Sequence, residues 1–211
     1  MPGLFVTFEG IEGSGKSTQV ARLEASLKLE RRPVVRTREP GGTELAEAIR
    51  KLILEVRQEP VHPETELLLF LAARAQHVRT LVQPALDEGQ IVLCDRFTDA
   101  TLAYQGGGRW VPEPELRRMN AWATGGLEPD LTFLLNVPVS AGIQRAKKRQ
   151  GFSGLDRIER EGSGFLEQVR SEYLKIAKSE PKRMKVLDGM MPEDELAEII
   201  LSDVKSRLAG P

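Results

Sequence analysis

A glycine-rich stretch near the start of the chain has the residue types and the spacing that bind phosphate groups. The stretch reads FEGIEGSGKSTQ over residues 8–19 and contains the order G-x-x-x-x-G-K-S. In such a loop the backbone N–H groups surround phosphate oxygens, the lysine reaches the β- and γ-phosphates, and the serine hydroxyl ligates Mg²⁺. The pattern therefore indicates a site for a nucleoside triphosphate, provided that the neighbouring segments can place the loop.

The segments on both sides of this stretch favour a nucleotide-binding loop. An apolar run at 4–8 precedes it, and Val20, Leu23 and Leu27 follow it at the spacing of one helix face. A loop between a buried strand and a helix N-terminus directs several N–H groups at one anion. The competing interpretation is a glycine-rich turn with a surface lysine. We predict that the nucleotide is bound by Gly10, Ile11, Glu12, Gly13, Ser14, Gly15, Lys16, Ser17 and Thr18, with Lys16 as a catalytic cation.

A carboxylate that holds the metal is expected at the end of a neighbouring buried strand. Asp95 ends the apolar run IVLCD, so we predict that Ser17 and Asp95 ligate the metal. Alternatively, Asp95 only caps the helix that follows it. The adjacent Arg96 favours metal ligation, because a planar guanidinium beside the metal suits a phosphate group.

The elements that must position these residues follow from hydrophobic periodicity. Short runs rich in Val, Leu and Phe predict strands, and segments with helical spacing lie between them, including 64–88 and 192–208. The predicted strands are 4–8, 33–37, 91–95, 131–137 and 184–189. This alternation predicts an α/β fold with a parallel sheet and helices on both faces. The glycine-rich pieces at 105–109, 124–126 and 150–154 are expected to be loops over a site, so 1–211 is expected to form one domain.

Composition excludes several classes of protein. Lys and Arg number 30 against 31 Asp and Glu, so no global positive field attracts nucleic acid. The single cysteine, Cys94, cannot form an internal disulfide. The first residues carry no basic signal-peptide region, and no apolar run reaches the ~18 residues of a membrane span. We therefore expect a cytoplasmic protein with neither a nucleic-acid nor a membrane partner.

The available general bases narrow the group that receives a phosphoryl group. The N-K-x-D motif of switch GTPases is absent, which leaves a small kinase as the best interpretation. A hydroxyl acceptor needs a general base, whereas a nucleoside monophosphate is already close to its dianion, with a second pKa of about 6. The only histidines, His62 and His77, are expected to be structural. A monophosphate acceptor is therefore favoured, because it needs only positioning and charge neutralisation.

Four further segments extend the pattern along the chain: TREPGGTELAEAIR (37–50), LLLFLAARAQHV (67–78), DRFTDATLAYQGGGR (95–109) and LDRIE (155–159). With the opening loop, and in the same order, they resemble the bacterial thymidylate kinase family over essentially the whole chain. The resemblance implies a P-loop NTPase fold with about five parallel strands, and usually a homodimer. It also implies transfer of the ATP γ-phosphoryl group to dTMP, with Mg²⁺, to give dTDP and ADP in dTTP biosynthesis.

Two alternatives to this function remain open. One is a P-loop kinase for another deoxynucleotide or deoxynucleoside, and the other is a catalytically silent nucleotide-binding homologue. Lys16, Ser17, Asp95 and Arg96 are all present, which speaks against the silent homologue.

The resemblance also assigns residues to the acceptor site. It implies that Phe70 stacks on thymine, that Arg74 reads the base and that Arg96 binds the dTMP phosphate. Phe70 and Arg74 are four residues apart and share a helix face. The complete implied dTMP site is Glu12, Glu39, Pro40, Phe70, Arg74, Arg96, Thr101, Tyr104 and Gln105. Ala100 departs from the family pattern, where serine is common, so one hydroxyl near the base is absent.

A lid segment is expected at about 142–160. Related enzymes carry a catalytic arginine either in the phosphate loop or in a mobile lid, and the loop position here is Gly13. The basic segment at 144–160 can replace the missing charge, with Arg145, Arg149 and Arg157 as the candidate catalytic residues. Which of them reaches the phosphates stays open. Without the resemblance, such a basic run would be interpreted as a solvated face.

Overall fold

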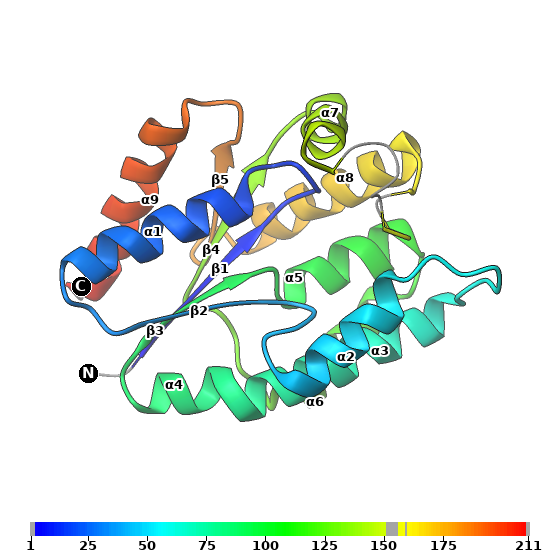
Figure 1. Cartoon of the computed structure of the whole chain (residues 1–211), viewed down its shortest axis with the longest axis horizontal. Coiled ribbons are helices and arrows are strands. Elements are labelled where there is room, and N and C mark those ends of the chain that lie inside the picture. Colours follow the sequence, from blue (N-terminus) through cyan, green and yellow to red (C-terminus); the bar gives the residue numbers. More distant parts are fainter. Residues whose placement is uncertain (1–2, 151–155, 159, 210–211) are drawn as a thin grey trace.

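The computed structural model describes residues 3–150, 156–158 and 160–209, except for the side chains of 149 and 150. Its strands are β1 (Leu4–Glu9), β2 (Val34–Arg38), β3 (Ile91–Asp95), β4 (Leu131–Asn136) and β5 (Met184–Asp188). They form one parallel sheet in the order β2-β3-β1-β4-β5 (Figure 1). The predicted parallel sheet is confirmed, and the strand ends differ from the predicted ones by at most one residue.

Helices connect the strands. They are α1 (Lys16–Leu29), α2 (Glu44–Leu54), α3 (Pro63–His77), α4 (Gln83–Asp87), α5 (Thr98–Thr101), α6 (Glu113–Thr124), α7 (Val139–Gln150), α8 (Ser163–Ser179) and α9 (Glu193–Leu208), with π-helical segments η1 (Val78–Val82) and η2 (Leu102–Gly108). The helix predicted over 64–88 is present as the succession α3, η1 and α4, and the helix predicted over 192–208 is α9. Within the described residues, no helix combines the length and the apolar character that a membrane crossing requires.

One expected loop is wrong, because 105–108 belong to η2. The glycines there serve close packing between η2 and α8. A Cβ atom on Gly107 would lie 2.7 Å from Cβ of Glu172, and one on Gly108 would lie 2.4 Å from the ring of Phe165. Glycine therefore lets two helices approach each other at this place, and the sequence pattern resembles that of a loop only because both need glycine.

The central strand β1 is buried on both faces of the sheet. Successive side chains of a strand point to opposite faces. Leu4, Val6 and Phe8 pack with α1 and α9, whereas Phe5 packs with η1 and α4. A further cluster joins α3, η2, α6 and α8. Figure 1 shows α1 and α9 on one side of the sheet and α3 and α4 on the other, which confirms the prediction of helices on both faces.

The topology opens a crevice at the carboxyl ends of β1 and β3. β1 connects through α1 to β2 at one edge of the sheet, whereas β3 connects to β4 on the opposite side of β1. Ligands of open α/β sheets bind where the connections of adjacent strands diverge in this way. Phe8 of β1 pairs with Asp95 of β3 at this edge. The loop after β1 and the carboxylate that ends β3 therefore meet at one place.

The last turn of α1 offers a matched test of the core. Leu27 is 0% exposed among β1, β3 and α9, whereas Leu29, two residues later, is 87% exposed. We expect Leu27→Ala to lower the free energy of unfolding by about 2–5 kcal/mol, because a cavity is left in the core. Leu29→Ala should change it by no more than about 0.5 kcal/mol. Urea unfolding midpoints measure both, and equal losses would contradict this description of the core.

Candidate active site

The phosphate loop lies between Glu9, the last residue of β1, and Lys16, the first residue of α1. The Nζ atom of Lys16 donates hydrogen bonds of 3.0 Å to the carbonyl oxygens of Gly10 and Ile11. Burial, and after it the nearby Arg96, lower the pKa of the Lys16 ammonium to about 8. The loop thus encloses a buried cation that its own carbonyl oxygens solvate.

A pocket of about 750 Å³, including its open mouth, lies over this loop. Its lining residues are Glu12, Gly13, Gly15, Lys16, Ser17, Thr18, Arg38, Glu39, Arg50, Asp95 and Arg96. Three residues of the predicted nucleotide site, Gly10, Ile11 and Ser14, do not line it. Ile11 instead packs in the core, while Gly10 and Ile11 offer their carbonyl oxygens to Lys16. We call this space the donor pocket.

The two predicted metal ligands lie side by side in the donor pocket. The Ser17 hydroxyl donates a 2.6 Å hydrogen bond to Oδ2 of Asp95. The described residues contain no cluster of three or more His, Cys, Asp or Glu side chains that could hold a metal. Mg²⁺ usually takes one or two protein ligands and completes its shell with substrate phosphates and water. One hydroxyl beside one carboxylate therefore fits Mg²⁺ that arrives with a nucleotide.

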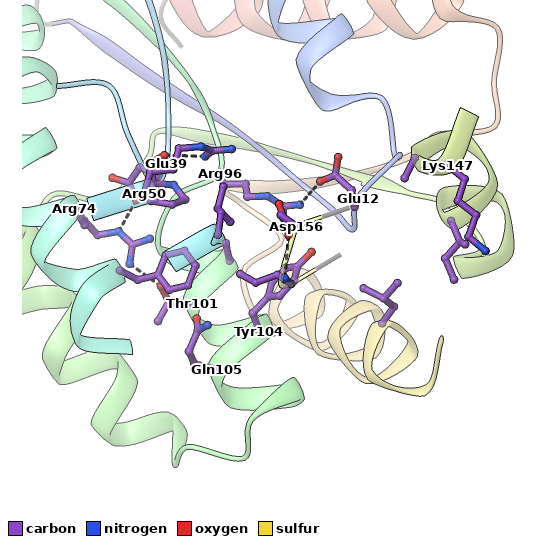
Figure 2. Close-up of a pocket in the computed structure, with 18 residues that line it drawn as sticks. Glu12, Glu39, Arg50, Arg74, Arg96, Thr101, Tyr104, Gln105, Lys147 and Asp156 are labelled. Carbon is purple, nitrogen blue, oxygen red and sulfur yellow. Dashed lines mark hydrogen bonds and ion pairs between the residues drawn. The ribbon is translucent and has the colours of Figure 1, made fainter. Parts of the chain in front are cut away.

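A second pocket, of about 960 Å³ including its mouth, adjoins the first (Figure 2). All nine residues of the implied dTMP site line it: Glu12, Glu39, Pro40, Phe70, Arg74, Arg96, Thr101, Tyr104 and Gln105. Glu12, Glu39, Arg50 and Arg96 line both pockets. We call this space the acceptor pocket, and these four shared residues mark its junction with the donor pocket.

Arg96 occupies the junction in a constrained conformation. Its φ angle is 72°, in the left-handed region that side chains other than glycine rarely adopt. Its Nη1 donates 2.8 Å to the carbonyl oxygen of Gly10, and its Nη2 lies 3.3 Å from Oε2 of Glu12. The guanidinium also lies over the ring of Tyr104, 5.1 Å from its centre. Three contacts of different kinds therefore fix one cation between the pockets.

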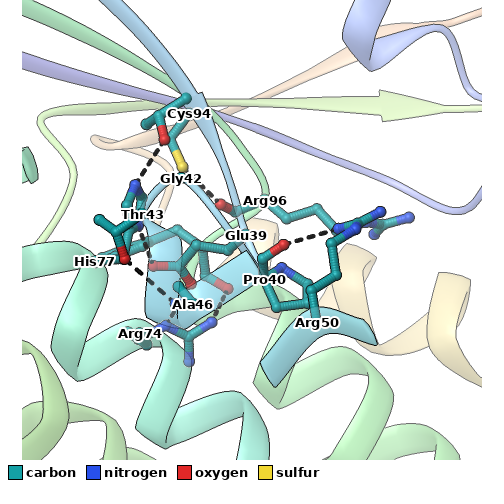
Figure 3. A network of polar contacts seen from close by, with 12 residues as sticks. Glu39, Pro40, Gly42, Thr43, Ala46, Arg50, Arg74, His77, Cys94 and Arg96 are labelled. Carbon is teal, nitrogen blue, oxygen red and sulfur yellow. Dashed lines mark hydrogen bonds and ion pairs between the residues drawn. The ribbon is translucent and has the colours of Figure 1, made fainter. Parts of the chain in front are cut away.

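Arg74 stands in a buried network that holds the acceptor pocket together (Figure 3). Its Nε donates 2.7 Å to Glu39, and its Nη1 donates to Thr101 at 2.7 Å and to Asn120 at 2.6 Å. Its Nη2 donates 2.8 Å to the carbonyl oxygen of Phe97. Within the described chain, these bonds use four of the five N–H groups of the guanidinium, and one on Nη2 is left.

Glu39 faces inward from the junction. One of its carboxylate oxygens bonds Arg74, and the other lies 2.9 Å from Nδ1 of His77. Nε2 of His77 in turn lies 2.7 Å from the hydroxyl of Thr37. Burial alone would raise the pKa of Glu39, but Arg74 and His77 hold it below its ordinary value. Glu39 therefore anchors the loop after β2, and His77 has the structural place expected from the sequence.

The lid arginines lie outside both pockets where the structure describes them. Arg145 donates 3.0 Å to the carbonyl oxygen of Gly189. Arg157 donates 2.9 Å to the carbonyl oxygen of Ile53, and its Nη2 lies 2.6 Å from Oε2 of Glu66. The side chain of Arg149 lies outside the described residues. Lys147 and Asp156 are the charged residues of the expected lid that line the acceptor pocket.

The phosphate loop touches the first turn of α7, the helix that enters the lid. A Cβ atom on Gly13, whose φ is 74°, would lie 2.2 Å from the carbonyl oxygen of Gly142. A Cβ atom on Gly142 would lie 2.7 Å from the carbonyl oxygen of Glu12. Two backbones are therefore in direct contact, and glycine is needed on both sides for steric reasons.

Two residues of this region escaped the sequence analysis. Arg50 lines both pockets from α2, and its Nη1 donates 2.8 Å to the carbonyl oxygen of Pro40. The sequence did contain a signal for Arg50. It is an arginine near the C-terminal end of α2, and it reaches back to the loop that precedes this helix. Glu9 is a buried carboxylate at the end of the apolar strand β1. The only signal in the sequence was an acidic residue directly after an apolar run, since such residues are rarely buried.

Comparison with known proteins agrees with this geometry. A model of the thymidylate kinase family matches residues 8–200. A thymidylate kinase of Methylococcus capsulatus is 48% identical over 209 residues, which are 99% of this chain and 98% of the relative. One of Pseudomonas savastanoi is 47% identical over 99% of this chain and 94% of its own length, and one of Desulfovibrio desulfuricans is 48% identical over 92% and 91%. Matched along nearly its whole length, the chain belongs to the thymidylate kinase family.

Proposed function

We propose that this chain transfers the γ-phosphoryl group of ATP to dTMP, giving ADP and dTDP. The observation that carries this proposal is the pair of adjoining pockets that share Arg96 at their junction. One pocket lies over a phosphate loop, and the other is lined by apolar and aromatic side chains that suit a base. The names of the relatives support dTMP as the acceptor and ATP as the donor.

On the donor side, the residues of the loop neutralise phosphate charge. Lys16 exchanges the carbonyl oxygens of Gly10 and Ile11 for the β- and γ-phosphate oxygens, and the loop N–H groups bind the same anion. Ser17 and Asp95 hold Mg²⁺, which supplies further neutralisation of the charge on the phosphates. The cation of Lys16 acts on charge that develops during transfer, so its contribution is to turnover.

On the acceptor side, Arg96 and Arg50 bind the dTMP phosphate at the junction. Two guanidinium groups hold a dianion in line with the donor, so no general base is required. Phe70 stacks on thymine, and the remaining N–H of Arg74 donates to the base. Gln105 donates 3.0 Å to Glu66, a carboxylate that can only accept, so the amide oxygen and the second amide N–H of Gln105 are left for the base.

The lid segment at about 142–160 closes over the phosphates on this proposal, and α7 couples it to the phosphate loop through Gly13 and Gly142. Whether Arg145, Arg149 or Arg157 supplies the catalytic charge stays a prediction. Homodimer formation and a cytoplasmic location also stay predictions. Leu68 of α3 and Trp122 of α6, 56% and 84% exposed, offer apolar surface for a dimer.

The acceptor preference is tested by measuring ADP release across dTMP, dUMP, other nucleoside monophosphates and thymidine. We expect dTMP to have the highest kcat/KM and thymidine to be inactive, because thymidine carries no phosphate group for the guanidinium groups of Arg96 and Arg50 to bind and hold in line. A preference for thymidine would contradict the proposed acceptor chemistry. No turnover with any acceptor would favour the silent homologue.

The role of Arg96 predicts a large kinetic effect. Arg96→Ala should lower kcat/KM for dTMP by about 100-fold or more, because a charge-assisted bidentate contact is lost. Arg96→Lys should restore little, since an ammonium cannot form that pair. Arg36, which pairs with Glu24 outside both pockets, provides the matched control Arg36→Ala. If steady-state kinetics give the same kcat/KM for dTMP in Arg96→Ala and Arg36→Ala, Arg96 does not bind the dTMP phosphate.

The contact between Gly13 and Gly142 predicts that Gly13→Ala slows turnover by roughly 10- to 100-fold. The added Cβ pushes α7 from the phosphate loop, and displacements of about 1 Å in a catalytic site have effects of this size. Gly126→Ala is the matched control, because Gly126 has a φ of 84° but no atom within 4 Å of the added Cβ. Single-turnover rates that fall equally in both variants would show that backbone strain, and not contact with α7, is responsible.

A further inference from the structure

A buried carboxylate outside both pockets lies directly behind Arg96. Glu9, the last residue of β1, is 0% exposed and lines neither the donor nor the acceptor pocket. Its Oε1 accepts a 2.7 Å hydrogen bond from the backbone N–H of Phe97. Its Oε2 accepts a 2.7 Å hydrogen bond from the hydroxyl of Tyr173 in α8. Both carboxylate oxygens are therefore used, each by a different segment of the chain.

Both of these hydrogen bonds lead to Arg96. Phe97 is the next residue, so its N–H belongs to the peptide group that Arg96 begins. The hydroxyl of Tyr173 accepts 3.3 Å from Nη1 of Arg96. A left-handed conformation at a residue other than glycine costs about 1–2 kcal/mol, so it persists only where its surroundings hold it. One oxygen of Glu9 thus holds the peptide group between Arg96 and Phe97. The other oxygen is linked to the guanidinium of Arg96 through the hydroxyl of Tyr173.

We infer that Glu9 is a positioning residue for the acceptor phosphate. It fixes the peptide after Arg96 and, through Tyr173, the direction in which the guanidinium of Arg96 points. This inference rests on the proposed role of Arg96 in binding dTMP. It adds a residue that lines neither pocket and acts through Arg96.

The polarity of the chain of bonds requires a carboxylate at this position. An amide at residue 9 can accept from Phe97 with its oxygen, but it must then present its NH₂ group to Tyr173. The hydroxyl of Tyr173 would accept from that NH₂ group and from Arg96 together, and its own hydrogen would lose its acceptor. Glu9→Gln therefore keeps the shape and the Phe97 bond, while it removes the acceptor of the Tyr173 hydrogen and so weakens the hold of Tyr173 on the guanidinium.

The same substitution should leave the fold intact. Burial, and after it Asp99, raise the pKa of the Glu9 carboxyl to about 7, against the opposing effect of Arg96 and the two hydrogen bonds. Because burial disfavours the charged form, a neutral group of the same shape is tolerated at this position. Kinetic changes in Glu9→Gln can then be attributed to Arg96 and not to unfolding.

The experiment compares Glu9→Gln, Tyr173→Phe and the double variant. We expect the KM for dTMP to rise about 10-fold in each single variant, while the KM for ATP changes less than about 2-fold. The double variant should be no worse than the single ones, because both substitutions act on the same link from Glu9 through Tyr173 to Arg96. Glu9→Ala, which also releases Phe97, should raise the KM for dTMP further, by about 100-fold.

Thr7→Val is the matched control, because Thr7 lies two residues before Glu9 on the same face of β1. Its hydroxyl bonds that of Thr132 at 2.7 Å, and Thr132 in turn accepts from Arg183 and not from Arg96. Thr7→Val should lower the melting temperature without moving the KM for dTMP. If Glu9→Gln behaves in the same way, Glu9 is only structural and the inference is overturned. If Arg96→Ala also leaves dTMP kinetics unchanged, the proposed role of Arg96 fails with it.

Discussion

The proposed function depends on one constraint, that the guanidinium of Arg96 is held at the junction of the donor and acceptor pockets. Phosphates repel one another, so a transfer site must place fixed positive charge where they meet. Arg96 meets that requirement because β3 ends beside β1, and the peptide after β3 turns in a left-handed conformation toward the phosphate loop. The sheet, the loop and the acceptor pocket are arranged around that one position.

Glycine has a steric role here that charge considerations alone would miss. The phosphate loop has Gly13 where some related enzymes have an arginine. The backbone of Gly13 lies against Gly142 of α7, so no side chain fits at this position. An arginine placed at position 13 would therefore displace α7, the helix at the start of the predicted lid segment.

Local patterns in the sequence predicted much of the fold and the site. Strand and helix periodicity, the phosphate loop and Asp95 at a strand end are all local signals, and the family resemblance placed nine residues around one pocket. Contacts between distant segments were not predictable. Glu9 and Tyr173 are 164 residues apart, and the glycines at 107 and 108 are explained only by the packing of η2 against α8. Where a side chain acts through a partner that is distant in sequence, a single sequence gives no signal except a charged residue within an apolar segment.

The central claim is that the donor and acceptor pockets meet at Arg96 so that their phosphates lie in line. The most direct test is the binding of a single molecule that joins adenosine and thymidine by a polyphosphate between their 5′ oxygens. By calorimetry and competition, it should bind at least ~100-fold more tightly than ATP or dTMP and should displace both. An affinity no higher than that of either nucleotide, or displacement of only one of them, would contradict the adjoining arrangement of the two pockets.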